Sequence, residues 1–430
     1  MQFSDQFTLL STPAHLSLVK LLLIFMFLLH LPYIGMFIGS SFFSVWYKFS
    51  DKRKNNTLYS TFARDLIDMV AFNKSIGITL GVLPLLVIAL IYSQVLYEGN
   101  ATTLSYLFYS FLPIILGLTF VYIYKYSIRL EKIFFSLMGA LGVLLLLVGY
   151  FVFIASIARF HDPEKWGFIK NPLQVLIGWN AIGNYLAFLT SSFAITGVGI
   201  IFFFFSWSDK LKDATSDYVA YVKKFGLIIG LIFTLLFPLF VLFQLINLPD
   251  IAFSNVLIIV SIILMILLAI VANLLSKMLQ SSQTKFGTHA FVLFILVFLV
   301  MILNSSIARE NSLQEHTKFL ALKSQAMLAK IIPEREIEEG GGITDYAKGE
   351  SVFKRVCSTC HRFEQKIVGP PYVTILPKYE EDIQQLIDFI SNPKKVNPDY
   401  PPMPNQGLKI TEVEAVAGYL LKTYQEEYKK

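Results

Sequence analysis

The residues best suited to chemistry in this 430-residue chain form one short motif near its C-terminus. Cys357 and Cys360 are separated by two residues, and His361 follows directly. The two-residue gap puts both thiols on one helical turn, where each can add to a haem vinyl group and form a thioether. The adjacent imidazole then lies beneath the iron as its proximal ligand. The motif therefore predicts one covalently attached haem c whose iron is bound by His361.

A zinc site and a redox dithiol are the two other interpretations of this spacing. A structural zinc ion normally takes four Cys or His ligands, and no second Cys/His pair follows in the sequence. A redox dithiol has no need of a histidine beside it. Haem attachment is therefore the favoured interpretation of Cys357, Cys360 and His361.

The segments around the motif carry a further pattern. Gly349 and Phe353 precede the first cysteine at intervals of four residues. Residues 368–372 read Val-Gly-Pro-Pro-Tyr, and residues 400–405 read Tyr-Pro-Pro-Met-Pro-Asn. Residues 411–424 predict a last helix, and Thr411 followed by Glu414 indicates a capping box at its start.

Together these segments resemble a class I cytochrome c over about residues 344–427. The resemblance implies that the Pro370 carbonyl holds the ring of His361 and that the Met403 sulfur is the sixth iron ligand. Such a His/Met iron has a raised potential and no vacant position for oxygen, which suits electron transfer. An exposed or a core methionine is the other interpretation of Met403.

Composition places the rest of the chain in a membrane. Hydrophobic residues make up 55% of the sequence and charged residues only 15%, well below the share in soluble domains. The segment 344–430 is neutral, with 12 basic and 12 acidic residues, although the whole chain carries +6. That neutral domain argues against a nucleic-acid partner, which would require a basic face.

The apolar runs predict an all-α protein, with an eight-helix transmembrane bundle followed by a small soluble helical cytochrome c domain. A span needs about 20 apolar residues. The expected domains are 1–307 for the bundle, 308–342 for a connecting helix with a glycine joint, and 343–430 for the haem domain. The connecting helix is expected over 309–332. The predicted spans are 17–46, 74–97, 104–124, 133–158, 180–206, 223–246, 253–276 and 288–307.

Basic residues between the spans predict the orientation, because cytoplasmic loops are enriched in Lys and Arg. The loops 47–73, 125–132, 207–222 and 277–287 are rich in them, whereas 98–103 and 247–252 have none. We expect the N-terminus and the haem domain on the periplasmic side of a bacterial inner membrane. Covalent haem attachment of this kind also occurs outside the cytoplasm.

Ionisable residues inside spans are candidates for function. His30 lies in the first span and is a candidate haem b ligand; a hydrogen-bonded packing residue and a quinone or lipid contact are its other interpretations. Arg159 and His161 follow the fourth span and are expected to be interfacial charges more often than a site.

The N-terminal part, over roughly 25–210, resembles subunit I of cytochrome bd-type quinol oxidases. The resemblance implies a haem ligand at His30. The histidine of the fifth span is missing, the acidic pair is absent from 104–124, and 247–252 is too short for a quinol-binding loop. Oxygen reduction is therefore not expected. The resemblance rests on these residues: His30, Pro32, Gly35, Met36, 72–77, Trp166, Asn171, Pro172, Thr196 and Gly197.

Three functions follow as hypotheses. The first is an electron-transfer subunit of a respiratory complex, with other membrane subunits, lipid or quinone, and a periplasmic cytochrome or oxidase as partners. The second is a quinol:cytochrome c oxidoreductase with a haem b in the membrane. The third is a haem-based sensor or a scaffold. The first is favoured, because the spans lack residue groups suited to bond-making chemistry.

Overall fold

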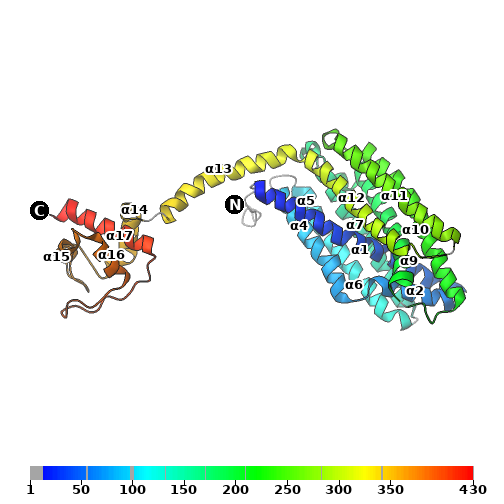
Figure 1. Ribbon diagram of the computed structural model, residues 1–430, viewed down its shortest axis with the longest axis horizontal. Coiled ribbons are helices and arrows are strands. Elements are labelled where there is room, and N and C mark those ends of the chain that lie inside the picture. The colour runs from blue at the N-terminus through cyan, green and yellow to red at the C-terminus, as the bar shows by residue number, and fades with distance from the viewer. Residues whose placement is uncertain are drawn as a thin grey trace. The chain divides into compact units, whose positions relative to one another are not determined.

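The computed structural model describes residues 13–54, 57–96, 101–130, 132–169, 171–208, 210–281, 283–339 and 342–429. All regular structure in these residues is helical, which confirms the predicted all-α class (Figure 1). The chain divides into two compact units, residues 1–321 and 322–430. The predicted domain boundaries, at 307 and 342, fall on either side of this division.

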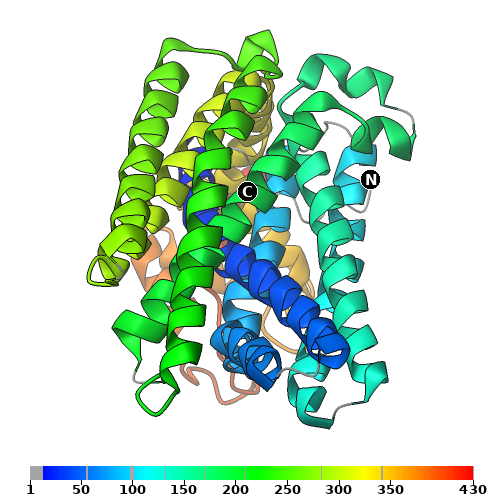
Figure 2. The same ribbon diagram turned by 90° about the vertical axis from the view of Figure 1, so that its right-hand side faces the viewer.

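The first unit contains the predicted bundle (Figure 2). Its described helices are α1 (Pro13–Lys54), α2 (Thr57–Val70), α3 (Lys74–Ile76), α4 (Leu83–Val95), α5 (Ala101–Tyr109), α6 (Phe111–Ser127), α7 (Ile133–Phe160), α8 (Pro172–Leu176), α9 (Trp179–Phe202), α10 (Ser216–Ile246), α11 (Asn255–Ser281) and α12 (Gly287–Ser312). Helix α13 (Gln314–Glu339) follows and runs across the boundary between the units.

Eight helical segments of the described residues are long and apolar enough to cross a membrane, as predicted. The chain is therefore a multi-pass membrane protein. The segments are His15–Asp51, Lys74–Val95, Thr103–Leu130, Ile133–Phe160, Trp179–Trp207, Ser216–Ile246, Asn255–Ser281 and Gly287–Ser312. The span of α9 is 72% buried and those of α10 to α12 only 33%, so α9 is a central helix and the other three turn broad apolar faces outward.

Helix α1 runs unbroken through Pro32 and packs against α2, α4, α7, α9 and α12. Its glycines allow a close approach to α9, because a Cβ at Gly39 would lie 2.1 Å from Thr196 Oγ1. Helices α9 and α10 approach even more closely, since a Cβ at Gly197 would lie 2.2 Å from the backbone nitrogen of Gly230. Small residues at such crossings let helix backbones touch, which is how helices associate within a membrane.

Helix α2 was not predicted, because residues 47–73 were expected to form a loop. The helix is amphipathic, and its apolar face packs on α1. The same face carries a buried acid, Asp65, whose Oδ2 accepts from Tyr218 Oη at 2.5 Å and whose Oδ1 pairs with Lys210 Nζ at 3.0 Å. These partners satisfy the buried carboxylate and attach α2 to the end of the bundle where the basic loops lie.

The helices around the end of the eighth span have other bounds than predicted. Helix α12 continues to Ser312, five residues past the expected end of the span, and α13 extends to Glu339 instead of 332. In the glycine joint, Gly340 and Gly341 lie outside the described residues, and Gly342 has open space around its Cα.

The second unit is a small helical domain built around one apolar core. Its helices are α14 (Tyr346–Arg355), α15 (Tyr372–Ile375), α16 (Ile383–Ser391) and α17 (Ile410–Thr423). Helix α14 packs on α17 at Gly349, where a Cβ would lie 2.1 Å from the carbonyl oxygen of Ala415. The predicted capping box at Thr411 and Glu414 is wrong. The helix begins at Ile410, two residues before the start that a Thr411 cap would give, and Glu412 Oε2 accepts from the backbone N–H of Lys409 at 3.0 Å.

We predict that Gly197→Ala destabilises the membrane unit by about 1–3 kcal/mol, because the new methyl group meets the backbone of α10, which has no flexible side chain to move away. Thermal unfolding of the purified protein measures the effect. Gly167→Ala is the matched control, since nothing lies within 4 Å of a Cβ there. Equal stability of the two variants would contradict the close contact between α9 and α10.

Candidate functional site

The motif residues of the second unit lie where α14 ends. Cys357–Thr359 form a short 3-10 turn, and the backbone N–H groups of Cys360 and His361 both donate to the carbonyl of Cys357, at 3.1 and 3.0 Å. This turn directs both sulfurs and the imidazole to one side of the chain, where all three line the same cavity. The Cys-x-x-Cys-His spacing thus brings both thiols and the imidazole to one site, as the sequence predicts.

The imidazole of His361 is held by the segment that follows the motif. Its Nδ1 lies 3.0 Å from the carbonyl oxygen of Pro370, so Nδ1–H donates this bond and Nε2 keeps the lone pair that a metal needs. The ring of Tyr372 stacks against the imidazole at a centroid distance of 5.1 Å. The segment 368–372 is held against the motif because the backbone N–H groups of Val368 and Gly369 both donate to the carbonyl of Cys360.

Gly369 is the position that leaves no room for a side chain. A Cβ there would lie 2.2 Å from Cε1 of His361, closer than any two such atoms approach. The backbone of Gly369 therefore lies directly against the imidazole, and only glycine fits there.

Met403 lies in an irregular loop on another side of the cavity. The loop is stiffened by Pro401, Pro402 and Pro404. It is also attached to α16, because Asn405 Nδ2 donates to the carbonyl of Ser391 at 3.0 Å. Gly407 allows the turn behind it, with a φ of +64°, and its N–H donates to Asn405 Oδ1 at 2.8 Å.

The cavity contains about 1000 Å³ of empty space. Its lining brings together the predicted haem residues from three separate segments: Cys357, Cys360, His361, Pro370 and Met403. Two thiols that can bond to the porphyrin vinyl groups, with a free imidazole nitrogen and a thioether sulfur for the iron, are the groups that a covalently attached haem takes. These residues therefore fit haem c.

The other interpretations of the motif find less support. Burial raises the pKa of the Cys357 thiol, whereas a reactive redox dithiol needs a lowered pKa. Within the described ranges, no group of three or more His, Cys, Asp or Glu side chains gathers to hold a metal ion. A zinc site would need such a group.

An ion pair joins the two helices that flank the motif. Arg355, the last residue of α14, contacts Glu412 of α17 with Nη2 and Oε1 2.6 Å apart. The N–H of Lys409 and, after it, the guanidinium lower the pKa of the Glu412 carboxyl. Because its pKa is lower in the folded state, the contribution to stability is present above the ordinary glutamate pKa and is lost as the pH falls through the lowered value.

His30, the candidate haem b ligand, lies buried between α1, α7 and the turn before α4. Its Nδ1 lies 3.0 Å from the carbonyl oxygen of Leu80, and its Nε2 lies 3.0 Å from Tyr150 Oη. One nitrogen donates and the other accepts, so both positions of a neutral ring are used. Iron ligation would require breaking one of these bonds. The arrangement fits the hydrogen-bonded packing residue better than a haem b ligand.

Arg159 and His161, which the sequence analysis treated as a pair, have different surroundings in the structure. Arg159 is half-buried and donates from Nε to the carbonyl of Val175 at 3.2 Å, which supports the C-terminal end of α8. His161 is buried and lines a cavity inside the membrane unit together with Arg309. Sequence reasoning missed Arg309 because it ended the eighth span at 307. The helical spacing of Ser305 and Ser306 to Arg309, which lies two residues past that point, was the available signal.

The second unit is thus a haem-binding helical domain of the cytochrome c type. In agreement, residues 346–423 match the family model described as Cytochrome c. The match implies a covalently bound haem c and haem-based electron transfer. It covers the C-terminal domain alone, and no similarity to cytochrome bd-type oxidases was found. Searches of curated proteins and of solved structures gave no match.

We predict that Gly369→Ala disturbs the proximal ligand, because the added methyl group overlaps the imidazole of His361. The expected result is less haem per protein and an altered absorption spectrum of the haem that is attached. A haem stain and the optical spectrum of the purified protein measure both. Gly342→Ala, with nothing within 4 Å of its Cβ, is the control, and an unchanged spectrum in Gly369→Ala would refute the crowding.

Proposed function

We propose that this protein is a membrane-anchored monohaem cytochrome c that passes single electrons between a membrane partner or quinol and a periplasmic carrier or oxidase, as a subunit of a respiratory complex. The observation that carries this proposal is the lining of one cavity by His361 and Met403 from separate segments of the haem domain. Two protein ligands complete the six-coordination of a porphyrin iron. Such an iron changes oxidation state without binding a substrate.

The ligand set also bears on the alternatives. A haem-based sensor needs an open iron position, which a methionine ligand closes. The quinol:cytochrome c oxidoreductase was expected to bind haem b through His30, and both ring nitrogens of His30 are hydrogen-bonded. Electron transfer without a second haem is therefore the favoured function.

The proposed location is the inner membrane, with the haem domain on the periplasmic side. Two independent arguments support this orientation. The loops expected in the cytoplasm carry most of the basic residues between the spans, and covalent haem attachment takes place outside the cytoplasm.

We predict that Met403→Ala lowers the reduction potential of haem c by tens to hundreds of millivolts, within the roughly 0.8 V that axial ligands span. Loss of the sulfur ligand should also open the iron to carbon monoxide. Redox titration and carbon monoxide difference spectra of the purified protein measure both effects. Met327→Ala, an exposed methionine of α13, is the matched control. A Met403→Ala protein with the wild-type potential would exclude ligation and favour the sensor or scaffold.

Orientation is tested with single cysteines and a membrane-impermeant maleimide on spheroplasts. Both native thiols are consumed as thioethers, so only the introduced residue reacts. We predict that Gln325→Cys in α13 is labelled, and that Ser208→Cys, in the loop before α10, is labelled only after the membrane is permeabilised. Both positions are exposed. The reverse pattern would place the haem domain in the cytoplasm and overturn the proposal.

A further inference from the structure

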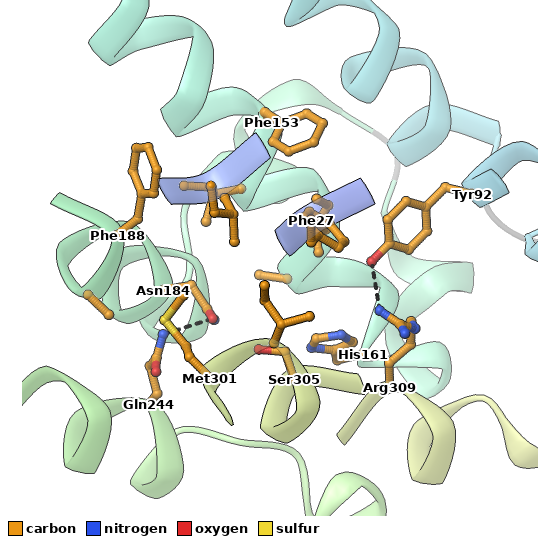
Figure 3. A pocket seen from close by; sticks show the side chains of 16 residues that line it. Phe27, Tyr92, Phe153, His161, Asn184, Phe188, Gln244, Met301, Ser305 and Arg309 are labelled. Carbon is orange, nitrogen blue, oxygen red and sulfur yellow. Dashed lines mark hydrogen bonds between the residues drawn. The ribbon is translucent and has the colours of Figure 1, made fainter. Parts of the chain in front are cut away.

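A cavity with about 750 Å³ of empty space lies inside the membrane unit, between α1, α4, α7, α9, α10 and α12. Aromatic and thioether side chains form much of its wall, and Figure 3 shows Phe27, Phe153, Phe188 and Met301 around it. The cavity is thus suited to a flat apolar ligand that reaches it from the membrane.

Polar groups reach this cavity from two sides. On one side, Gln244 of α10 donates from Nε2 to Asn184 Oδ1 at 3.0 Å, and on the other lie His161 and Arg309 (Figure 3). Asn184 is itself fixed, since its Nδ2 donates to the side-chain oxygen of Asn180 at 2.6 Å. The bond to Asn184 uses one N–H of Gln244, and the amide has a second N–H and a carbonyl oxygen to offer a ligand.

His161 is a buried polar group with an unused atom. Its side chain is only 5% exposed, and its Nε2 has no hydrogen-bond partner among the described residues. An unpaired polar atom away from water is costly, so such atoms normally have a partner. The imidazole lines the cavity, where a ligand oxygen would supply that partner.

Arg309 adds a buried cation to the same side. It is 7% exposed, and its Nη1 and Nη2 donate to Tyr92 Oη at 3.4 Å and to Ser306 Oγ at 2.8 Å. No carboxylate of the described residues pairs with it, and the neighbouring Glu310 pairs instead with Lys20. A charged residue inside a membrane bundle without a counter-ion marks a functional site by default.

A second, more polar cavity of about 380 Å³ adjoins the first and shares His161, Asn184, Gln244 and Ser305 with it. Beyond it, a surface hollow shares Asn180 and is lined by charged side chains such as Asp162 and Lys165. Polar groups therefore continue from the apolar cavity to the end of the bundle. A ligand that exchanges protons would need such a series.

We propose that this cavity binds the ring of a membrane quinone or quinol, with one ring oxygen hydrogen-bonded by His161 and the opposite oxygen by Gln244. The two polar sides match a flat apolar ring with one oxygen at each end. An anionic phospholipid headgroup would pair with the guanidinium of Arg309 but would leave the amide of Gln244, on the other side, without a ligand. The inference extends the proposed function by naming the class of membrane donor, but it concerns binding and is tested as binding.

The experiment uses the full-length haem protein in nanodiscs of phosphatidylcholine, titrated calorimetrically with decyl-ubiquinone and, separately, with a short-chain menaquinone. Empty nanodiscs are the blank. We expect saturable binding at one site per protein for at least one of the two quinones. Ser305→Phe, which fills the cavity, should weaken binding at least tenfold, whereas Leu303→Phe, at an exposed position on the same helix, should bind like the wild type.

A second pair of variants tests the histidine itself. His161→Leu should bind about tenfold more weakly, the effect of one lost hydrogen bond to a buried group, and His161→Gln should bind within about threefold of the wild type. His289→Leu, an exposed histidine at the other end of the bundle, should change nothing. An unchanged haem c spectrum and elution profile show that a variant is folded. If His161→Leu does not fold, the Ser305→Phe and Leu303→Phe pair decides.

Three results would overturn the quinone site. The first is no saturation above empty nanodiscs, and the second is wild-type affinity in Ser305→Phe. The third is that phosphatidylglycerol displaces the quinone and that a phospholipid bound to the wild type is lost in Ser305→Phe. The last result would assign the cavity to a lipid. Reduction of haem c by the matching quinol is measured separately. If binding is intact but the haem is not reduced, the proposed electron-transfer route fails while the binding site stands.

Discussion

The absence of water inside a membrane is the constraint on which most of this structure depends. Every backbone polar group there must find a partner within the protein, and an unbroken helix provides one for each residue. Eight helical spans follow from this requirement. Helix α1 continues through Pro32 although proline has no N–H to donate. The same constraint applies to side chains. His30 meets it with two partners, whereas His161 Nε2 does not, and that contrast separates a packing histidine from one available to a ligand.

The haem domain solves a different problem, because its chemistry needs one nitrogen left free. The carbonyl of Pro370 takes the Nδ1 proton of His361, so the lone pair of Nε2 stays available. Gly369 and Tyr372 both contact the ring of His361 and restrict its movement, and the proline-rich loop places Met403 at the same cavity. A ligand set held in advance in this way changes little when the iron gains or loses an electron, which favours fast transfer.

The sequence was most informative where one physical requirement dominates. Hydrophobic length located all eight spans, and the order Cys-x-x-Cys-His identified the haem site. The sequence was less informative where tertiary contacts determine the local structure. Helix α2 was missed because its apolar face is matched by polar residues, and the capping box was misplaced because Glu412, not Glu414, reaches the helix start. Arg309 was missed because its charge seemed to end the span, although the helix continues past it and buries it.

The close approach of α9 and α10 at Gly197 and Gly230 has a consequence for how the membrane cavity can open. Because the backbones of α9 and α10 are in direct contact, the two helices cannot easily slide past each other and behave as one rigid body. Asn184 and Gln244 belong to that body, and their side of the cavity is stationary. Entry of a bulky ring would therefore have to move one of the other helices that line the cavity, and α12, which carries Ser305 and Arg309, is one of these.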